Sequence, residues 1–171
     1  MTSVVSWGIE TKLRLFAAYL DISKEESEFR ASIVQEACSW IGTPYRKGAR
    51  VKGVGCNCAQ FLYGVAQGAK VLPGDSPEPR RFSEQFALNE KRERIAEYVM
   101  AYGGIEIEES ASKPGDIVLY KTGQSHGHAA ILVDDKTIVH CVAPAGCQFG
   151  AIDEGALARY SRRYFTLWRA E

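Results

Sequence analysis

The chain has 171 residues, of which 46% are hydrophobic and 25% charged, so it can bury one core within the usual length of a single domain. Lys and Arg number 21, and Asp and Glu also number 21, so no overall charge draws it toward nucleic acid or an anionic membrane. No apolar run is long enough for a membrane span. We expect a single domain over residues 1–171, with residues 1–30 as a helical N-terminal extension.

The first 20 residues lack the order of residue types found in a secretory signal. Glu10, Lys12 and Arg14 fall where the apolar core of such a signal would lie. We therefore expect synthesis in the cytoplasm without a signal peptide, so that action outside the cell would need another route of delivery. The five cysteines are odd in number and sparse, so we expect reduced thiols.

Helices dominate the first part of the chain. Residues 11–20 are expected to form a short helix, and Ser23 with Glu26 fits a capping box that begins a second helix. Its apolar face would comprise residues 29, 33, 37, 40 and 41, and it would end near Gly42. Residues 46–55 contain three glycines and no apolar period, so we expect an exposed loop. From Cys58 onward, apolar residues at helical spacing predict a buried helix.

Strands dominate the second part. Residues 72–81 contain three prolines and are expected to form a loop, and residues 83–102 are expected to form one charged helix that ends at Gly103. Strands are then expected at residues 105–109, 116–121, 128–134, 137–142 and 164–169. Helices followed by a mostly antiparallel sheet of five to six strands indicate an α+β domain.

Cys58 is the first candidate for chemistry. A cysteine in the first turn of a helix lies beside unpaired amides and the positive end of the helix dipole, which favour a thiolate. The competing interpretation is that Cys58 is only the first residue of a buried face. A nucleophilic thiolate also needs a base and a group that orients it. The chain has three histidines, His126, His128 and His140, and a hairpin would bring the last two together, for catalysis, metal binding or packing.

The order of these residues matches the papain-like arrangement, in which a sheet supplies base and orienting group to a thiolate on a helix. Four motifs in order resemble the NlpC family of cell-wall cysteine peptidases, over about residues 33–142. They are residues 40–48 (WIGTPYRKG), 57–60 (NCAQ), 113–120 (KPGDIVLY), and the pair 128–133 (HAAILV) with 136–141 (KTIVHC). The flanking segments most resemble the phage-tail-associated branch of that family.

The resemblance implies a papain-like NlpC fold and a peptidase that cuts peptidoglycan stem peptides, of the γ-D-glutamyl–diamino acid type, without a cofactor. It implies Cys58 as nucleophile, His128 as general base and acid, and His140 as the residue that orients the imidazole. Tyr45 would lie beside the nucleophile, and the backbone amide of Cys58 would hold the oxyanion. His126 competes as base, could share the strand face of His128, and is assigned to the rim of the site.

Three positions depart from the family pattern. Asn57 and Ala59 replace an aspartate and a serine that help bind the substrate, and Asn57 keeps hydrogen bonding but loses the charge that would pair with an ammonium. Gln60 replaces a glycine, which narrows the cleft. We therefore assign Tyr45, Asn57, Ala59, Gln60 and His126 to substrate binding, with the stem specificity open.

Three hypotheses follow. The first is a peptidase of muropeptides, virion-associated or acting in cytoplasmic recycling of wall peptides. The second is a phage-tail module that keeps the fold without turnover, together with other tail proteins as partners. The third is a zinc-binding domain, for which Cys-x-Cys at Cys56 and Cys58 is a weak signal, supplemented by Cys141 and Cys147. We expect no metal, and we expect Cys56 to be a small loop residue.

Overall fold

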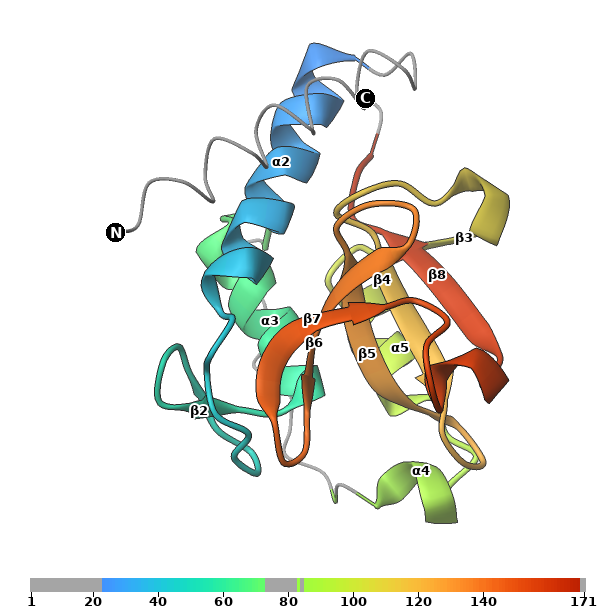
Figure 1. The fold of residues 1–171 in the computed structure, drawn as a ribbon. Helices are drawn as coiled ribbons and strands as arrows, with labels where there is room; N and C mark the ends of the chain where they lie inside the picture. Colours follow the sequence, from blue (N-terminus) through green and yellow to red (C-terminus); the bar gives the residue numbers. More distant parts are fainter. Residues whose placement is uncertain (1–22, 73–82, 84, 170–171) are drawn as a thin grey trace.

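The computed structural model describes residues 23–72, 83 and 85–169, and in it helices pack against a six-stranded antiparallel sheet (Figure 1). The helices are α2 (Lys24–Ser39), α3 (Cys58–Gly68), α4 (Phe86–Asn89) and α5 (Arg94–Ala101), with 3-10 turns η1 (Glu109–Ala111) and η2 (Leu157–Arg159). The helix expected at residues 11–20 and nearly all of the proline-rich loop lie outside the described residues. None of the described helices is both long and apolar enough to cross a membrane.

The sheet confirms the α+β class. Its strands are β3 (Ile105–Ile107), β4 (Ile117–Lys121), β5 (His126–Leu132), β6 (Thr137–Val142), β7 (Gly146–Ala151) and β8 (Arg162–Thr166). They pair antiparallel in the order β3-β8-β4-β5-β6-β7. Two short strands, β1 (Arg50–Val51) and β2 (Gly55–Cys56), form a separate hairpin.

The helix cap predicted at Ser23 is present. Its Oγ accepts a hydrogen bond from the amide of Glu26 at 3.1 Å, and α2 begins at the next residue, Lys24. Trp40 is buried as expected, but Ile41 is 39% exposed because the helix ends at Ser39. The apolar face is therefore one residue shorter than the pattern predicted.

A buried ion network fixes α2 to the sheet. Arg30 donates from Nε to Glu26 Oε1 at 2.7 Å and from Nη1 to Asp116 Oδ1 at 2.7 Å. Nη1 also donates to the carbonyl of Pro114 at 3.1 Å, and Lys113 Nζ lies 3.1 Å from Glu26 Oε1. The Pro-Gly-Asp turn before β4 is therefore an anchoring point for α2.

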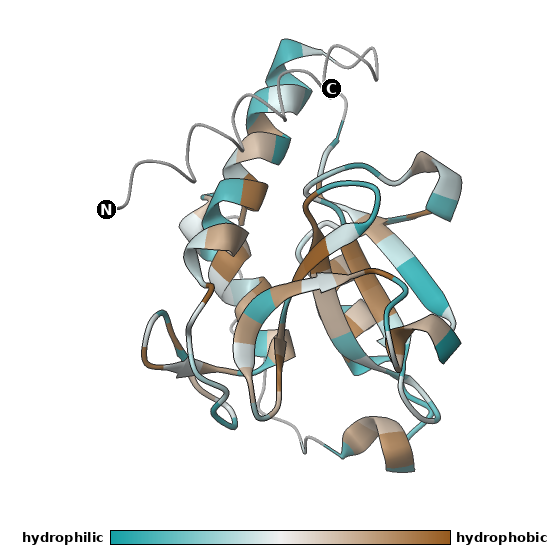
Figure 2. Ribbon diagram, viewed as in Figure 1, coloured by the Kyte–Doolittle hydropathy of each residue, from teal (hydrophilic) through white to brown (hydrophobic). Residues whose placement is uncertain are grey.

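One main core joins the helices to the sheet. α3 packs against both β5 and β6, and Phe61 and Val65 of α3 are fully buried there with Leu119, Ala129 and Val139 of the sheet. Figure 2 shows strongly hydrophobic residues along β4 and β5 and hydrophilic residues on β8. A smaller buried cluster contains Tyr120, Ile138 and Ile152 together with other residues of β4, β5 and β8. The start of α3 is thereby held against the middle of the sheet.

Residues 83–102 do not form the single helix that the sequence predicted. α4 ends at Asn89, Glu90 is extended (φ −126°, ψ 137°), and α5 begins at Arg94. No apolar residue lies between Leu88 and Ile95, so this stretch has no buried face to hold a helix. Instead, Glu93 accepts a hydrogen bond from the backbone amide of His126 at 3.0 Å.

Residues 46–55 are largely exposed as expected, but they do not form a loop throughout, because β1 pairs with β2. The expectation for Cys56 is wrong, since Cys56 lies in β2 with no exposed surface and is not a loop residue. β7 was not predicted, because Gly146 and Gly150 disrupt its apolar pattern. It forms because β6 offers a continuous edge, with Cys141 opposite Cys147 and His140 opposite Gln148.

Candidate active site

Cys58 occupies the first position of α3. Asn57 is the N-cap, and its Oδ1 accepts a hydrogen bond from the amide of Gln60 at 2.9 Å. The helix dipole and the terminal amides of α3 favour negative charge on the Cys58 sulfur. Cys58 Sγ lies 3.7 Å from the carbonyl oxygen of Gly127, directly before His128. The helix start therefore meets the start of β5.

The pairing of β5 with β6 brings His128 and His140 together. His140 lies opposite Ala130, so His128, two residues earlier on the same face, is its diagonal neighbour. His128 Nε2 is 3.0 Å from His140 Nδ1, and the ring centroids are 5.1 Å apart at an angle of 72°. One hydrogen bond thus links the two imidazoles.

Both imidazoles are held neutral. Burial, followed by the repulsion that protonation of both rings would create, lowers the pKa of His128 to about 3, and burial lowers the pKa of His140. A single proton then occupies the link between the rings. If His128 Nε2 donates it, His128 Nδ1 keeps its free lone pair and is the nitrogen that can accept a proton.

Cys58 and both histidines line one cavity of about 390 Å³. Among the residues assigned to the site from the sequence, six line this cavity: Tyr45, Asn57, Cys58, Ala59, His128 and His140. The cavity is also lined by residues that no sequence pattern marked, among them Thr122, Leu157 and Tyr160. The segment near η2 lacks a helix or strand period, so no pattern marks it.

His126 and Gln60 do not line the cavity. The pairing of β4 with β5 shifts so that Tyr120 lies opposite His128 while Lys121 lies opposite His126. This bulge places one extra residue between the two histidines, so they occupy opposite faces of the sheet, whereas the sequence suggested a shared face. His126 Nδ1 lies 3.0 Å from both Glu93 carboxylate oxygens. Gln60 is buried, and its Oε1 accepts a hydrogen bond from Arg50 Nη1 at 3.2 Å.

Two glycines make room for the site, and no pattern in the sequence marks either of them. A Cβ at Gly150 of β7 would lie 3.1 Å from His140 Nε2. A Cβ at Gly127 would overlap the side chains of Ala87 and Thr122. Bare backbone at these positions lets β7 approach His140 and lets the start of β5 approach α4.

Comparisons with known proteins agree on the fold. No family model matches the chain. A protein named murein DD-endopeptidase MepS/murein LD-carboxypeptidase from Escherichia coli K12 is 24% identical over 127 residues, which are 74% of this chain and 57% of that protein. The same figures hold for the protein of that name from Escherichia coli O157:H7. The chain thus spans little more than half the length of these relatives.

Two solved structures resemble this one. The NlpC/p60 domain of the peptidoglycan hydrolase SagA has a TM-score of 0.55 at 20% identity, covering 78% of this chain and 96% of that one. The peptidoglycan hydrolase RipB from Mycobacterium tuberculosis has a TM-score of 0.56 at 16% identity, covering 99% of this chain and 87% of that one.

Proposed function

Because the chain has the NlpC/p60 fold, we propose that it is a cysteine peptidase that hydrolyses peptide bonds in peptidoglycan stem peptides. The observation that supports this most directly is the 3.0 Å bond between His128 and His140 in the cavity that Cys58 lines. A thiol at a helix start, a neutral imidazole and a second imidazole that orients it supply the groups for acyl transfer.

The reaction begins with a proton transfer. The Cys58 thiol gives its proton to Nδ1 of His128, and the thiolate attacks the carbonyl carbon of the scissile bond. His140 Nδ1 accepts the hydrogen bond from His128 Nε2, which fixes the tautomer and the orientation of the ring. His140 is therefore a positioning residue, whereas Cys58 and His128 touch the reacting atoms.

The tetrahedral intermediate needs donors for its oxyanion. The backbone amide of Cys58 is one of the terminal N–H groups of α3, and Tyr45 lines the same cavity, where its hydroxyl can polarise the carbonyl. His128 then returns its proton to the leaving amine, which departs and leaves a thioester on Cys58. Water attacks the thioester with His128 again as base, which frees the carboxylate product and restores the thiol.

For the substrate we propose the bond between γ-D-glutamate and a diamino acid of the stem peptide. Asn57 offers a neutral amide where a carboxylate would pair with the free amine of such a stem, so that charge pairing is lost. The Oδ1 of Asn57 already accepts the hydrogen bond that caps α3, and the amide nitrogen that is left only donates. This arrangement favours stems whose group near Asn57 is uncharged or anionic.

The test is hydrolysis of purified muropeptides of several stem types, followed by mass spectrometry. Wild-type protein is expected to release stem fragments, and Cys58→Ala is expected to release none. Cys38→Ser is the matched control, because Cys38 lies on α2, is half-buried and does not line the cavity. A Cys58→Ala variant as active as the wild type would overturn the proposal.

A second candidate is a module of a phage tail that keeps the fold without turnover, which Asn57 and Ala59 favour. Alkylation by iodoacetamide near neutral pH separates the two. Fast modification of Cys58, mapped by peptide mass spectrometry, supports the peptidase, and an inert Cys58 supports the module.

We propose that the protein works at the cell wall as part of a phage or prophage tail, with other tail proteins as partners. Its detection in purified virions by mass spectrometry tests this point. Absence from virions together with hydrolysis of muropeptides would favour cytoplasmic recycling of wall peptides.

A further inference from the structure

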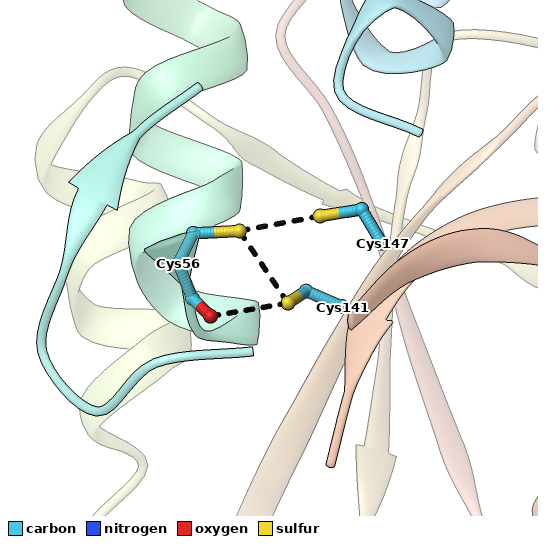
Figure 3. Close-up of side chains that lie close together, drawn as sticks. All are labelled: Cys56, Cys141 and Cys147. Carbon is cyan, nitrogen blue, oxygen red and sulfur yellow. Dashed lines mark hydrogen bonds between the residues drawn. The ribbon is translucent and has the colours of Figure 1, made fainter. Parts of the chain in front are cut away.

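Three of the five cysteines meet in the interior. Cys56 of β2, Cys141 of β6 and Cys147 of β7 form a thiol cluster, in which all three side chains are buried (Figure 3). Cys56 Sγ lies 3.2 Å from Cys147 Sγ and 3.4 Å from Cys141 Sγ, and all three sulfurs lie within 4.8 Å of one another. Sulfur atoms from three separate strands thus converge on one point.

Backbone hydrogen bonds hold these cysteines in place. The amide of Cys147 donates to Thr43 O at 2.8 Å, and its carbonyl accepts from the amide of Gly42 at 2.9 Å. The amide of Cys56 donates to Pro44 O at 3.0 Å. Cys141 lies directly opposite Cys147 in the sheet. One short segment after α2 therefore positions two of the thiols, so little order has to be gained when a ligand binds.

We propose that Cys56, Cys141 and Cys147 bind one thiophilic metal ion, and that Cu(I) is the ion they suit best. Thiolate ligands select soft metals, among them Cu(I) and zinc. Structural zinc sites use four ligands, whereas among the described residues no further His, Cys, Asp or Glu joins these three. A three-coordinate ion needs no fourth group.

The spacing of the sulfurs is compatible with such an ion. With metal–sulfur bonds of about 2.3 Å, a trigonal centre separates its sulfurs by about 4.0 Å. The present distances of 3.2 and 3.4 Å are shorter, so the thiols have to move apart by less than about 1 Å. Small rotations of three cysteine side chains provide that change.

Metal binding releases thiol protons and leaves negative charge on the sulfurs, and the surroundings of the cluster can take up both. Each thiol makes one hydrogen bond to another thiol that lowers its pKa and one that raises it, and burial then raises the pKa of each to about 12, so the ion-free cluster is neutral. Metal binding displaces thiol protons, and because Cys141 also lines the active-site cavity, solvent there can accept them. Cys56 lies two residues before Cys58, the first residue of α3, and the positive end of this helix dipole favours the negative charge that remains on the sulfurs.

The cluster connects the two sides of the candidate active site, independently of the reaction proposed above. Cys56 is two residues before Cys58, and Cys141 directly follows His140. An ion bound by both therefore fixes the position of α3 relative to β6. If these cysteines serve only as small apolar side chains, the protein should take up no Cu(I). If they are ligands, replacing one of them with alanine should weaken Cu(I) binding.

The test uses the full chain with Cys38→Ser and Cys58→Ala, so that only the thiol cluster remains. Cu(I) is added without oxygen in the presence of bathocuproine disulfonate, a chromophoric competitor. We expect one Cu(I) to be withdrawn from the competitor per chain and X-ray absorption to show three sulfur ligands. Adding Cys147→Ala should weaken binding on the order of 100-fold or more, since even changes outside the ligand shell cost about 10- to 100-fold.

A second measurement keeps the proposal testable even if Cys147→Ala fails to fold. Its reference chain carries Cys38→Ser and Cys58→Ala and retains all three cluster cysteines. Cu(I) bound to the cluster should raise the melting temperature of this reference chain. The proposal is overturned if the reference chain takes no Cu(I) from the competitor or if its melting temperature does not rise. It is also overturned if nitrogen or oxygen ligands dominate the absorption spectrum, or if a folded Cys147→Ala variant binds as tightly as the reference.

Discussion

At the scale of single residues, the candidate site depends on what surrounds each imidazole. His128 and His140 have their pKa lowered by burial, and a 3.0 Å bond joins them. His126 occupies the other face of the sheet and pairs with Glu93. Three histidines that look alike in the sequence thus have two different environments, and only two of them line the cavity.

If His140 positions His128, its loss should lower kcat and leave KM little changed. We expect His140→Ala to reduce kcat about 10²-fold or more. His140→Asn should recover part of the rate, because its side-chain oxygen can accept the hydrogen bond from His128 Nε2. Steady-state kinetics on a muropeptide would measure both constants. Equal rates for the alanine and asparagine variants would contradict the positioning role.

Burial of His128 should also make folding sensitive to acid. Its pKa is about 3 in the folded protein and about 6.5 in the unfolded chain, so below pH 6.5 only the unfolded chain takes up the proton. The stabilisation is complete above pH 6.5 and is lost as pH falls toward 3, by up to about 1.4 kcal/mol per pH unit. Urea unfolding at pH 8 and pH 5 should show a smaller loss for His128→Asn than for the wild type. An identical loss in both proteins would refute this account.

At the scale of elements, helix ends and turns determine where the reactive side chains lie. Asn57 caps α3 and thereby defines Cys58 as its first residue. The Pro-Gly-Asp turn anchors α2 through Arg30, and the hydrogen bonds from residues 42–44 to Cys147 and Cys56 connect the end of α2 to β7 and β2. Short segments of irregular backbone therefore position the regular elements.

The cap at Asn57 can be separated from its role in substrate binding. Asn57→Ala should destabilise the fold by about 0.5–2 kcal/mol, because the amide of Gln60 loses its acceptor. Asn57→Asp keeps that acceptor and restores a negative charge, so stability should be retained while KM falls for stems that carry a free amine. Denaturant unfolding and kinetics on amine-bearing and amine-blocked stems would measure the two effects. A lower KM for the blocked stems as well would argue against charge pairing.

Breaking the ion network of Arg30 should lower the free energy of unfolding substantially. Arg30→Met leaves the Asp116 carboxylate buried without its charge partner, so we expect a loss of about 3–5 kcal/mol in the free energy of unfolding. Arg92→Met is the matched control, because the ion pair of Arg92 with Glu97 is exposed to solvent and its loss should change the free energy of unfolding far less. Similar losses for the two variants in denaturant titrations would show that the buried network adds no special stability.

At the scale of the whole molecule, one core spans both halves of the chain. Ile33 of α2, Phe61 of α3 and Ile95 of α5 share a single cluster with Leu119 and Val139 of the sheet. The helices and the sheet therefore depend on each other for burial of their apolar faces. The candidate site lies at the junction, since α3 supplies the thiol and the sheet supplies both histidines.

This shared core predicts that the protein unfolds in one cooperative transition. Calorimetric and van't Hoff enthalpies should agree, and circular dichroism and tryptophan fluorescence should give the same melting temperature. Arg30→Met should shift that single transition to a lower temperature without splitting it. Two separate transitions would show that the helical part and the sheet fold as independent units, against the single domain expected from the sequence.

The sequence by itself determined the helix that begins at Cys58, the cap at Ser23 and the existence of five of the six strands. These depend on local chemistry and on the spacing of apolar residues along the chain, which the sequence displays directly. It also gave the order of thiol and histidines, since motif spacing is a property of the chain. The sequence shows no apolar residue between Leu88 and Ile95, but a charged segment can also continue as an exposed helix. The break at residues 90–93 was therefore missed, and contacts such as the bond from the His126 amide to Glu93 accompany it in the structure.

Only the tertiary structure decided which side chains meet. The bulge in β5 places His126 and His128 on opposite faces of the sheet, and the spacing of apolar residues does not predict one extra residue in a strand. β7 forms because β6 offers an edge, and this brings Cys147 next to Cys141 and Cys56, up to 91 positions apart in the chain. Cys56, which the sequence suggested was a loop residue, is buried for that reason. Contacts of this kind depend on strand pairing and register. Both are properties of two distant segments together, so neither segment's sequence alone predicts them.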